Sequence, residues 1–227
     1  MNPETNGLNE FYSSPGTSGR TLFQTWELGE ARGDSVTPST YSSRYRDWMH
    51  DKLLRAIKDS ETDRLLSLGS GNAAVESGIA QTGYRVLAVD AVQEAVDIAA
   101  AKGVEALRAD VMTWSPEGRW PVVYADGLLG HLYAEGRGLA PVFERIHAWL
   151  TADGTRGTFI ASNDSPPSAE PTQAAPGVPG FYWLSGEYLR GEALGAGFSA
   201  VEVQYFDYDR PLSGQRSRAV ITATVGF

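Results

Sequence analysis

The segment RLLSLGSGNAAVESGIAQTGYRVLAVD, from Arg64 to Asp90, limits the fold of this chain more than any other part of it. It reads as a short apolar run, a glycine turn, a helical stretch, a second apolar run and an acid. Short buried strands that alternate with helices are typical of βαβ units, which build parallel sheets. The segment therefore predicts an α/β fold with a glycine turn between its first strand and the helix that follows.

The same alternation continues along the rest of the chain. Strands are expected near residues 64–68, 84–89, 104–107, 121–125 and 156–161, and helices near 41–58, 73–82, 91–102, 135–150 and 185–195. Two late strands near 198–208 and 216–226 alternate with period two and predict an edge hairpin joined through the Leu212–Gln215 turn. The 227 residues fit one α/β domain with insertions.

Two irregular stretches flank this pattern. The arm before residue 41 is rich in Gly, Pro, Ser and Thr but carries the aromatic residues Phe11, Tyr12, Phe23 and Trp26. Disordered tails are poor in aromatic residues, so we expect the arm to fold over something. We divide the chain into an arm and cap helix at 1–58 and a core at 59–227, in which the Pro-rich segment 163–183 is a lid-like loop.

The glycine turn and two acids outline a nucleoside site. Glycine permits close backbone approach to a ligand, and the start of a helix offers unpaired N–H groups. Asp90 ends the second strand, 19 residues after Gly71, where a carboxylate can accept both hydroxyls of an adenosine ribose. Asp110 follows the third strand, where it can accept from an adenine amino group, and Ala91 and Val92 can lie against the adenine face. Ligands of such sheets bind at these carboxyl ends.

These motifs make the chain resemble the class I S-adenosylmethionine (SAM)-dependent methyltransferases. The resemblance covers roughly residues 20–165 plus the final helix and hairpin, and it rests on LLSLGSGNA, VLAVDAVQEAVDIA, RADVMTW and VVYADGLLGHL. It implies a Rossmann-like fold with a seven-stranded, mostly parallel sheet, a C-terminal β-hairpin, helices on both faces and an N-terminal arm. The segments LFQTWELGEARGD, STYSSRYRDWMHDKLL and DGLLGHL are similar to the glycine N-methyltransferase-like subgroup.

The resemblance implies SAM as cofactor, S-adenosylhomocysteine as product and a set of site residues. The expected cofactor contacts are Gly69, Ser70, Gly71, Asp90, Ala91, Val92, Asp110, Val111, Ala125, Arg44, Trp26 and His131. The expected catalytic residues are His131 and Tyr41, and the expected substrate contacts are Phe23, Tyr45, Asp126, Asn163, Tyr182 and Trp183. The implied reaction is methyl transfer to nitrogen or oxygen of a small natural-product or amine-type metabolite.

Four positions depart from the family pattern. Ser67 stands where the first motif usually has an acid, and Ala73 stands where it has its third glycine. Tyr41 stands where the glycine enzyme has an arginine for the SAM carboxylate, although Arg44 lies one turn on. Asn163 stands where that enzyme holds its substrate carboxylate with an arginine, which disfavours glycine as substrate.

Other interpretations stay open. A SAM-binding regulatory module without turnover fits Ser67 and Ala73, and an NAD(P)-dependent oxidoreductase fits the glycine turn. The dinucleotide pattern G-x-G-x-x-G would need glycine at position 74, where Ala74 stands, and it has no role for Asp110. Asp126 with Asn163 and Asp164 could hold Mg²⁺, but the rest of the catechol-type pattern is missing and we expect no metal.

Composition narrows the partners. The formal charge of −9 disfavours nucleic acid and mildly favours a cationic or neutral small molecule. The sequence has no cysteine, no apolar run long enough for a membrane span and no secretory signal, so we expect a cytoplasmic protein away from membranes. The aromatic arm leaves a homodimer open.

Overall fold

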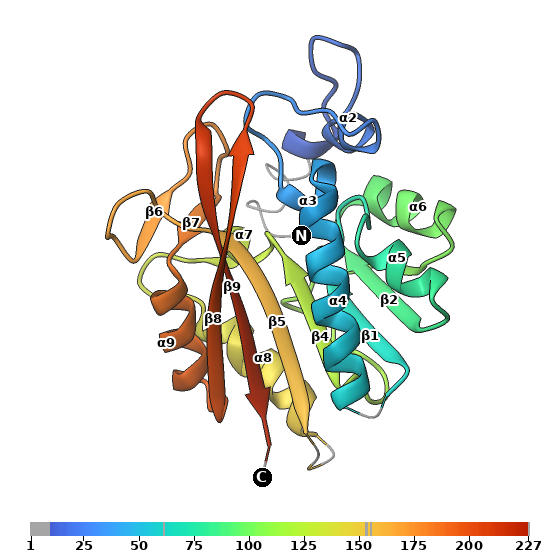
Figure 1. The fold of residues 1–227 in the computed structure, drawn as a ribbon, viewed down its shortest axis with the longest axis vertical. Helices are drawn as coiled ribbons and strands as arrows, with labels where there is room; N and C mark the ends of the chain where they lie inside the picture. The colour runs from blue at the N-terminus through green and yellow to red at the C-terminus, as the bar shows by residue number, and fades with distance from the viewer. Residues whose placement is uncertain (1–9, 61, 153, 155, 227) are drawn as a thin grey trace.

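A twisted seven-stranded sheet forms the centre of the molecule (Figure 1). The computed structural model describes residues 10–60, 62–152, 154 and 156–226. In sheet order the strands are β3 (Glu105–Arg108), β2 (Arg85–Asp90), β1 (Arg64–Leu68), β4 (Val122–Asp126), β5 (Gly157–Asp164), β9 (Gly214–Val225) and β8 (Ala200–Arg210). β3, β2, β1, β4 and β5 run parallel, and β9 and β8 add an antiparallel hairpin. The expected seven-stranded, mostly parallel sheet with a C-terminal hairpin is confirmed.

Helices cover both faces of the sheet (Figure 1). Their bounds are α4 (Ser43–Asp59), α5 (Glu76–Gln81), α6 (Gln93–Ala101), α7 (Leu129–Leu132), α8 (Ala140–Thr151) and α9 (Gly186–Gly195). Side chains alternate across a strand, so neighbours face different layers. Leu65 packs in the layer of α4 and α5, while Leu66 and Leu68 pack in the layer of α8 and α9.

Two helix starts follow from local chemistry. Ser42 caps α4 because its side chain accepts the N–H of Tyr45. α8 begins at Ala140, five residues later than expected, with Pro141 in its first turn. The residues before it instead form a short bridge between Ala134 and Gly138.

The Pro-rich loop has structure of its own. β5 continues to Asp164, and β6 (Thr172–Ala174) and β7 (Tyr182–Leu184) then pair as a small antiparallel ladder. This ladder lies beside the upper part of the β8–β9 hairpin in Figure 1. The hairpin connection, residues 211–213, is shorter than the expected strand ends at 208 and 216 imply, because β8 reaches Arg210 and β9 already starts at Gly214.

The N-terminal arm lies over the carboxyl end of the sheet (Figure 1). It contains α2 (Leu22–Glu27), whose N-terminus is closed by a capping box of Thr21 and Gln24, and α3 (Pro38–Tyr41). Thr21 also donates to Glu94 of α6, and Lys102 after α6 pairs with Glu27. The arm is thus attached to the core at both ends of α2.

The position of α7 beneath the loop can be tested at Gly130. A Cβ there would lie 2.5 Å from the carbonyl oxygen of Tyr182, although the helical backbone itself would accept alanine. We expect Gly130→Ala to lower the free energy of unfolding by about 1–3 kcal/mol through overpacking. In α9, Gly191 has no atom within 4 Å of its Cβ position, so Gly191→Ala is the matched control and should not destabilise. Urea unfolding measures both, and equal midpoints would contradict the close packing of α7.

Candidate functional site

The glycine turn lies at the point where the strand order of the sheet reverses. β1 pairs with β2 on one side and with β4 on the other, and the carboxyl ends of such strands form the usual ligand crevice. Gly69 and Gly71 have φ angles of 65° and 53°, a region that glycine enters without strain. A Cβ on Gly69 would lie 2.9 Å from the Leu128 side chain. The turn therefore needs glycine at position 69 for both conformation and space.

Asp90 joins this turn to the end of β2. Its Oδ2 accepts the N–H of Gly71 at 3.0 Å, and its Oδ1 accepts the N–H of Val92 at 2.9 Å. Burial raises the pKa of Asp90 to about 6, although the two backbone hydrogen bonds favour the ionised form. Each oxygen has a further lone pair. The structure thus brings Gly71, Asp90 and Val92 together, with acceptors suited to two hydroxyl groups.

The other residues expected to contact a nucleoside lie at the neighbouring strand ends. Asp110 follows β3, and its Oδ1 accepts the N–H of Met112 at 2.9 Å. Val111 is buried behind it, and Ala125 is buried near the end of β4. These positions extend the crevice on both sides of β1.

Three polar atoms of expected site residues are buried without a partner. Among the described residues, Ser70 Oγ, Asp126 Oδ2 and His131 Nδ1 have no hydrogen bond. An unsatisfied buried polar group costs about 1–3 kcal/mol unless water or a ligand pairs with it. The edge from β1 to β4 is therefore equipped to hydrogen-bond a ligand.

The aromatic arm covers this edge. Trp26 donates its indole N–H to the Ser35 carbonyl at 2.8 Å, and its ring would lie 3.6 Å from a Cβ on Gly71. Phe23 stacks on Tyr12 with ring centroids 5.3 Å apart, and the Tyr12 hydroxyl lies 2.8 Å from His131 Nε2. The arm thus excludes water from the glycine turn and from His131.

Burial sets the protonation of this pair. It lowers the pKa of His131 to about 4, so the imidazole is neutral near pH 7. Burial and the charge of Asp90 both raise the pKa of Tyr12, so its hydroxyl keeps its proton. Because its pKa is low, neutral His131 can form a hydrogen bond with a ligand but is a weak proton acceptor.

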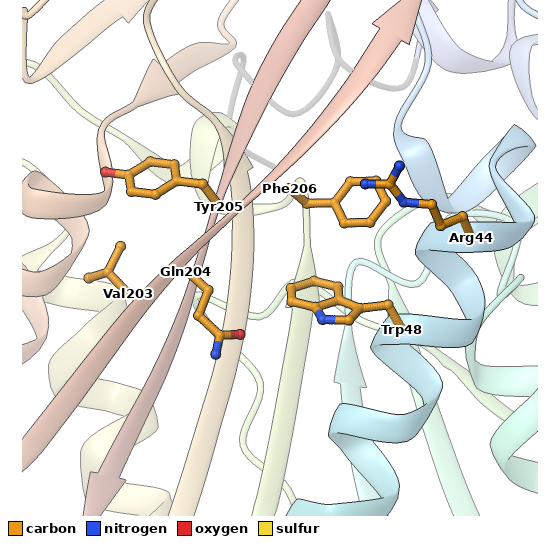
Figure 2. A pocket seen from close by; sticks show the side chains of 6 residues that line it. All are labelled: Arg44, Trp48, Val203, Gln204, Tyr205 and Phe206. Carbon is orange, nitrogen blue, oxygen red and sulfur yellow. The ribbon is translucent and has the colours of Figure 1, made fainter.

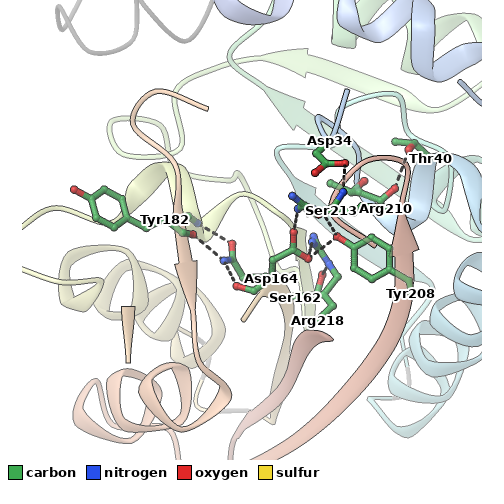
Figure 3. Close-up of polar contacts among 12 residues, drawn as sticks. Asp34, Thr40, Ser162, Asp164, Tyr182, Tyr208, Arg210, Ser213 and Arg218 are labelled. Carbon is green, nitrogen blue, oxygen red and sulfur yellow. Dashed lines mark hydrogen bonds and ion pairs between the residues drawn. The ribbon is translucent and has the colours of Figure 1, made fainter. Parts of the chain in front are cut away.

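A buried ion cluster lies under the ends of β4 and β5 (Figure 3). Arg218 of β9 is fully buried and pairs with Asp126 and with Asp164, the latter at 2.9 Å. Its Nε also donates to Ser162 Oγ at 3.0 Å. Arg210 of the same hairpin pairs with Asp164. The cluster ties the hairpin to the two strands that border the site.

Two expected substrate residues have partners within the protein. Tyr45 is fully buried, and its hydroxyl donates to Ser162 at 3.0 Å. Asn163 is also fully buried, and it accepts the Gly130 N–H at 3.0 Å while donating to the Tyr182 carbonyl. Asn163 therefore holds α7 against β7, and a contact of either residue with substrate stays a prediction. Asp126 keeps one free oxygen in the described structure.

The three aromatic residues that end the Pro-rich loop each pack against another part of the protein. Phe181 packs on His131 with ring centroids 4.6 Å apart. Tyr182 packs on Tyr133 and donates its exposed hydroxyl to Glu135 at 3.0 Å. Trp183 is buried beside the hairpin.

Tyr41 and Arg44 have contacts of another kind. The Tyr41 hydroxyl donates to the carbonyl of Asp209 at the end of the hairpin. The Arg44 guanidinium lies 4.9 Å from the centroid of the Phe206 ring, in a surface groove between α4 and β8 (Figure 2). These contacts do not support the expectation that Tyr41 acts in catalysis or that Arg44 binds a cofactor carboxylate.

Three contributors to the site carry little or no local signal in the sequence. Tyr12 reads only as part of the covering arm, because no pattern connects it to His131. Glu76 accepts from Ser67 at 2.6 Å and thereby places an acid beside the position where the family motif usually has one. Arg218 was missed although Arg216 and Arg218 alternate within an otherwise apolar strand, which was the available signal.

The described residues include neither a metal-binding cluster nor a membrane-spanning helix. In that part of the chain no group of three or more His, Cys, Asp or Glu side chains is arranged to hold a metal ion. None of its helices combines the length and apolar character needed to cross a membrane.

Comparison with known proteins gives one close relative and several similar folds. No protein-family model matches the chain. The tabtoxin biosynthesis enzyme of Pseudomonas amygdali pv. tabaci is 41% identical over 213 residues, which cover 92% of this chain and 83% of that protein.

Several similar solved structures are methyltransferases. Magnesium protoporphyrin IX methyltransferase (ChlM) from Synechocystis PCC 6803, with bound SAM, has a TM-score of 0.63 at 14% identity, over 97% of this chain and 98% of that one. The glycopeptide N-methyltransferase MtfA, complexed with S-adenosylhomocysteine, has a TM-score of 0.53 at 13% identity, over 77% and 86%. A SAM-dependent methyltransferase from Archaeoglobus fulgidus has a TM-score of 0.56 at 15% identity, over 78% and 94%. These likenesses show the class I methyltransferase fold.

The buried cluster predicts a large effect at Arg218. Arg218→Met would leave Asp126 without its cation in a buried setting, and we expect the free energy of unfolding to fall by about 3–5 kcal/mol. Arg85 forms an exposed pair with Glu105, so Arg85→Met should leave the urea midpoint nearly unchanged. Equal midpoints for the two variants would contradict the role assigned to the cluster.

Proposed function

The chain belongs to the family of the tabtoxin biosynthesis enzyme, and we propose that it transfers a methyl group from SAM to a small metabolite. The observation that carries this proposal is the Asp90 carboxylate, held by the N–H groups of Gly71 and Val92 at the reversal point of the sheet. The class I methyltransferase fold supports it. The relative's printed role in tabtoxin biosynthesis favours secondary metabolism.

The adenosine half of SAM is assigned to the ends of β1, β2 and β3. Asp90 accepts the two ribose hydroxyls beside the Gly69–Gly71 turn, where the N–H of Gly71 donates to the same carboxylate. Asp110 accepts from the adenine amino group. The apolar side chains that enclose the adenine are Ala91, Val92 and Val111, and Ala125 borders the site at β4.

The methyl end is assigned to the space enclosed by the arm and α7. When bound, SAM supplies a methyl carbon already activated by its sulfonium sulfur. The chain must therefore mainly hold the acceptor in line with that carbon, about 3 Å away, and exclude water. Trp26 and Phe23 form the wall, His131 and Tyr12 supply neutral hydrogen-bonding groups, and the free oxygen of Asp126 can accept from an amine or hydroxyl of the acceptor.

The proposal leaves the acceptor atom as either nitrogen or oxygen. Neither Asp126 nor His131 selects between an amine and a hydroxyl as the group that is methylated. The likeness to glycine N-methyltransferases rests on the arm and on the DGLLGHL stretch, and we keep it as part of the proposal without glycine as substrate.

A SAM-binding module without turnover is the second candidate. Ser67 and Ala73 at two motif positions favour it, and Ala73 adopts a φ of 50° that is uncommon for alanine. Methyl-labelled SAM separates the candidates when the protein is incubated with panels of amines, phenols and hydroxy acids. Formation of S-adenosylhomocysteine that requires an added acceptor supports the enzyme, whereas tight binding without product under every panel supports the module.

Asp90 provides the first test of the cofactor. Asp90→Ala removes two acceptors for the ribose hydroxyls, and hydrogen bonds to a charged group contribute about 1.5–3 kcal/mol each. We therefore expect calorimetry to show S-adenosylhomocysteine binding about a hundredfold weaker in the variant. Asp97→Asn on the exposed side of α6 is the control and should bind as wild type does. If NADH bound in place of S-adenosylhomocysteine, the cofactor assignment would be wrong.

The pKa of Asp90 predicts a pH dependence for the same binding. The ionised carboxylate accepts ribose hydroxyls, and its pKa is about 6 in the free protein, so affinity is full above that pH and falls below it. Between pH 8 and pH 5 we expect S-adenosylhomocysteine to bind about tenfold more weakly. Glu76, whose pKa burial raises to about 7, titrates in the same range, so Glu76→Gln serves as a control that should keep the profile. A flat profile in both proteins would refute the role of Asp90.

A further inference from the structure

Arg216 is a buried arginine outside the ion cluster. It lies on β9 close to the hairpin turn, and only 9% of its surface is exposed. Its guanidinium carbon lies 3.7 Å from the centroid of the Trp183 ring. Stacking of this kind uses the flat face of the guanidinium and leaves the N–H groups in its plane free to bind other groups.

The in-plane edge of Arg216 has no partner. Within the described residues, its Nε and Nη2 are both buried and form no hydrogen bond. These two atoms make up the side-on edge of a guanidinium, which matches the two oxygens of a carboxylate in a bidentate pair. The indole N–H of Trp183 is also buried and unpaired in the described structure. The stacked pair of Arg216 and Trp183 thus carries three buried donors without an acceptor in the described structure.

The nearby carboxylates do not supply that acceptor. Asp126 and Asp164 are bound by Arg218, and Asp164 is bound by Arg210 as well. Asp34, whose charge also acts on Arg216, accepts the N–H groups of Leu212 and Ser213. The Arg210 guanidinium lies 5.9 Å from the centroid of the Trp183 ring, so a second cation is close to the same ring. Burial is the first cause of the lowered pKa of Arg216 and the charge of Arg210 the second, and the charges of Asp164 and Asp34 offset them only in part.

Arg216 lies on the acceptor side of the proposed site. Residues two apart on a strand share a face, so Arg216 and Arg218 point the same way, and Arg218 reaches Asp126 at the end of β4. Trp183 stands two residues after Phe181, which packs on His131. Arg216 and Trp183 are thus each two residues along the chain from a residue that contacts the methyl end, Arg218 at Asp126 and Phe181 at His131.

We propose that Arg216, stacked on Trp183, binds a carboxylate group of the methyl acceptor. This inference rests on the proposed function and narrows its substrate to a metabolite that carries a carboxylate. The positive edge of Arg216 thus favours an anionic group, whereas the overall charge of −9 favours a cationic or neutral molecule. The carboxylate supplies the acceptor that the Arg216 edge lacks and fixes the methyl acceptor at one end, while its amine or hydroxyl lies toward Asp126.

The test uses a matched pair of probes, N-acetylglycine and N-acetylglycinamide, which differ at the carboxylate alone. Each is titrated into the ¹⁵N-labelled full chain, and the Arg216 Nε–H and Trp183 Nε1–H signals are followed, with Trp183→Phe used to assign the latter. We expect N-acetylglycine to shift both signals with saturation, and the amide to bind about tenfold more weakly or not at all. Equal binding of the two probes, or no saturation with either, would overturn the inference and leave water as the partner of this edge.

Variants of Arg216 separate the loss of carboxylate binding from a general loss of folding. Arg216→Gln should abolish the response to N-acetylglycine, and Arg216→Lys, which keeps charge without the fork, should weaken it about tenfold. Arg190→Gln, at an exposed arginine of α9, is the matched control and should respond as wild type does. The wild-type comparison of the two probes remains decisive even if Arg216→Gln fails to fold.

Binding of S-adenosylhomocysteine distinguishes whether Arg216 pairs with the carboxylate of the methyl acceptor or with that of the cofactor. If Arg216 serves the acceptor, Arg216→Gln binds S-adenosylhomocysteine as wild type does. If the variant instead loses affinity for S-adenosylhomocysteine but not for 5′-methylthioadenosine, the carboxylate is that of the cofactor and the acceptor assignment is wrong. Failure of the wild type to bind S-adenosylhomocysteine would refute the proposed function, while the probe titration still reports on Arg216 independently.

Discussion

The buried pairing of Arg218 with Asp126 and Asp164 is the interaction on which the site depends most. It joins β9 to the ends of β4 and β5, and it does so at the edge where ligands of this fold bind. Burying these charges is costly, and only the close pairing and the added hydrogen bond to Ser162 offset that cost. Because each partner would be strongly unfavourable alone, the hairpin, the two strands and Tyr45 are held in one arrangement. The free oxygen of Asp126 is directed by the same contacts.

The arm and the glycine turn form the second half of the site. α2 is attached through Glu94 and Lys102 of the α6 region, so its aromatic residues lie over Gly71 and His131. This cover excludes water, and the loss of water is the cause of the raised pKa of Asp90 and the lowered pKa of His131. A ligand with hydroxyl donors would satisfy the carboxylate that burial makes unfavourable. The electrostatics and the cover are therefore two consequences of one packing arrangement.

The sequence predicted most elements well because their signals are local. The strand at residues 64–68 coincides with β1, and the expected helix at 185–195 differs from α9 by one residue. Periodic burial and a terminal acid are sufficient for such elements. The expected helix at 135–150 begins five residues before α8. Nothing local in the sequence separates residues 135–139 from the helix, because the Ala134–Gly138 bridge that holds them apart is visible only in the structure. The sequence shows the polar groups of Tyr45 and Asn163 but not their partners, Ser162 and Gly130, because these lie far away in the chain.

The sequence by itself determined the parallel sheet, the glycine turn and the acid at the end of β2. Each of these depends on residues within about 20 positions of one another, so spacing alone is informative. Only the tertiary structure decided which polar groups are paired, because the partners lie far apart in the chain. Tyr12 meets His131 across 119 residues, and Arg218 meets Asp126 across 92. The same folding leaves the side-on edge of Arg216 without an acceptor in the described structure, a property that no local pattern encodes.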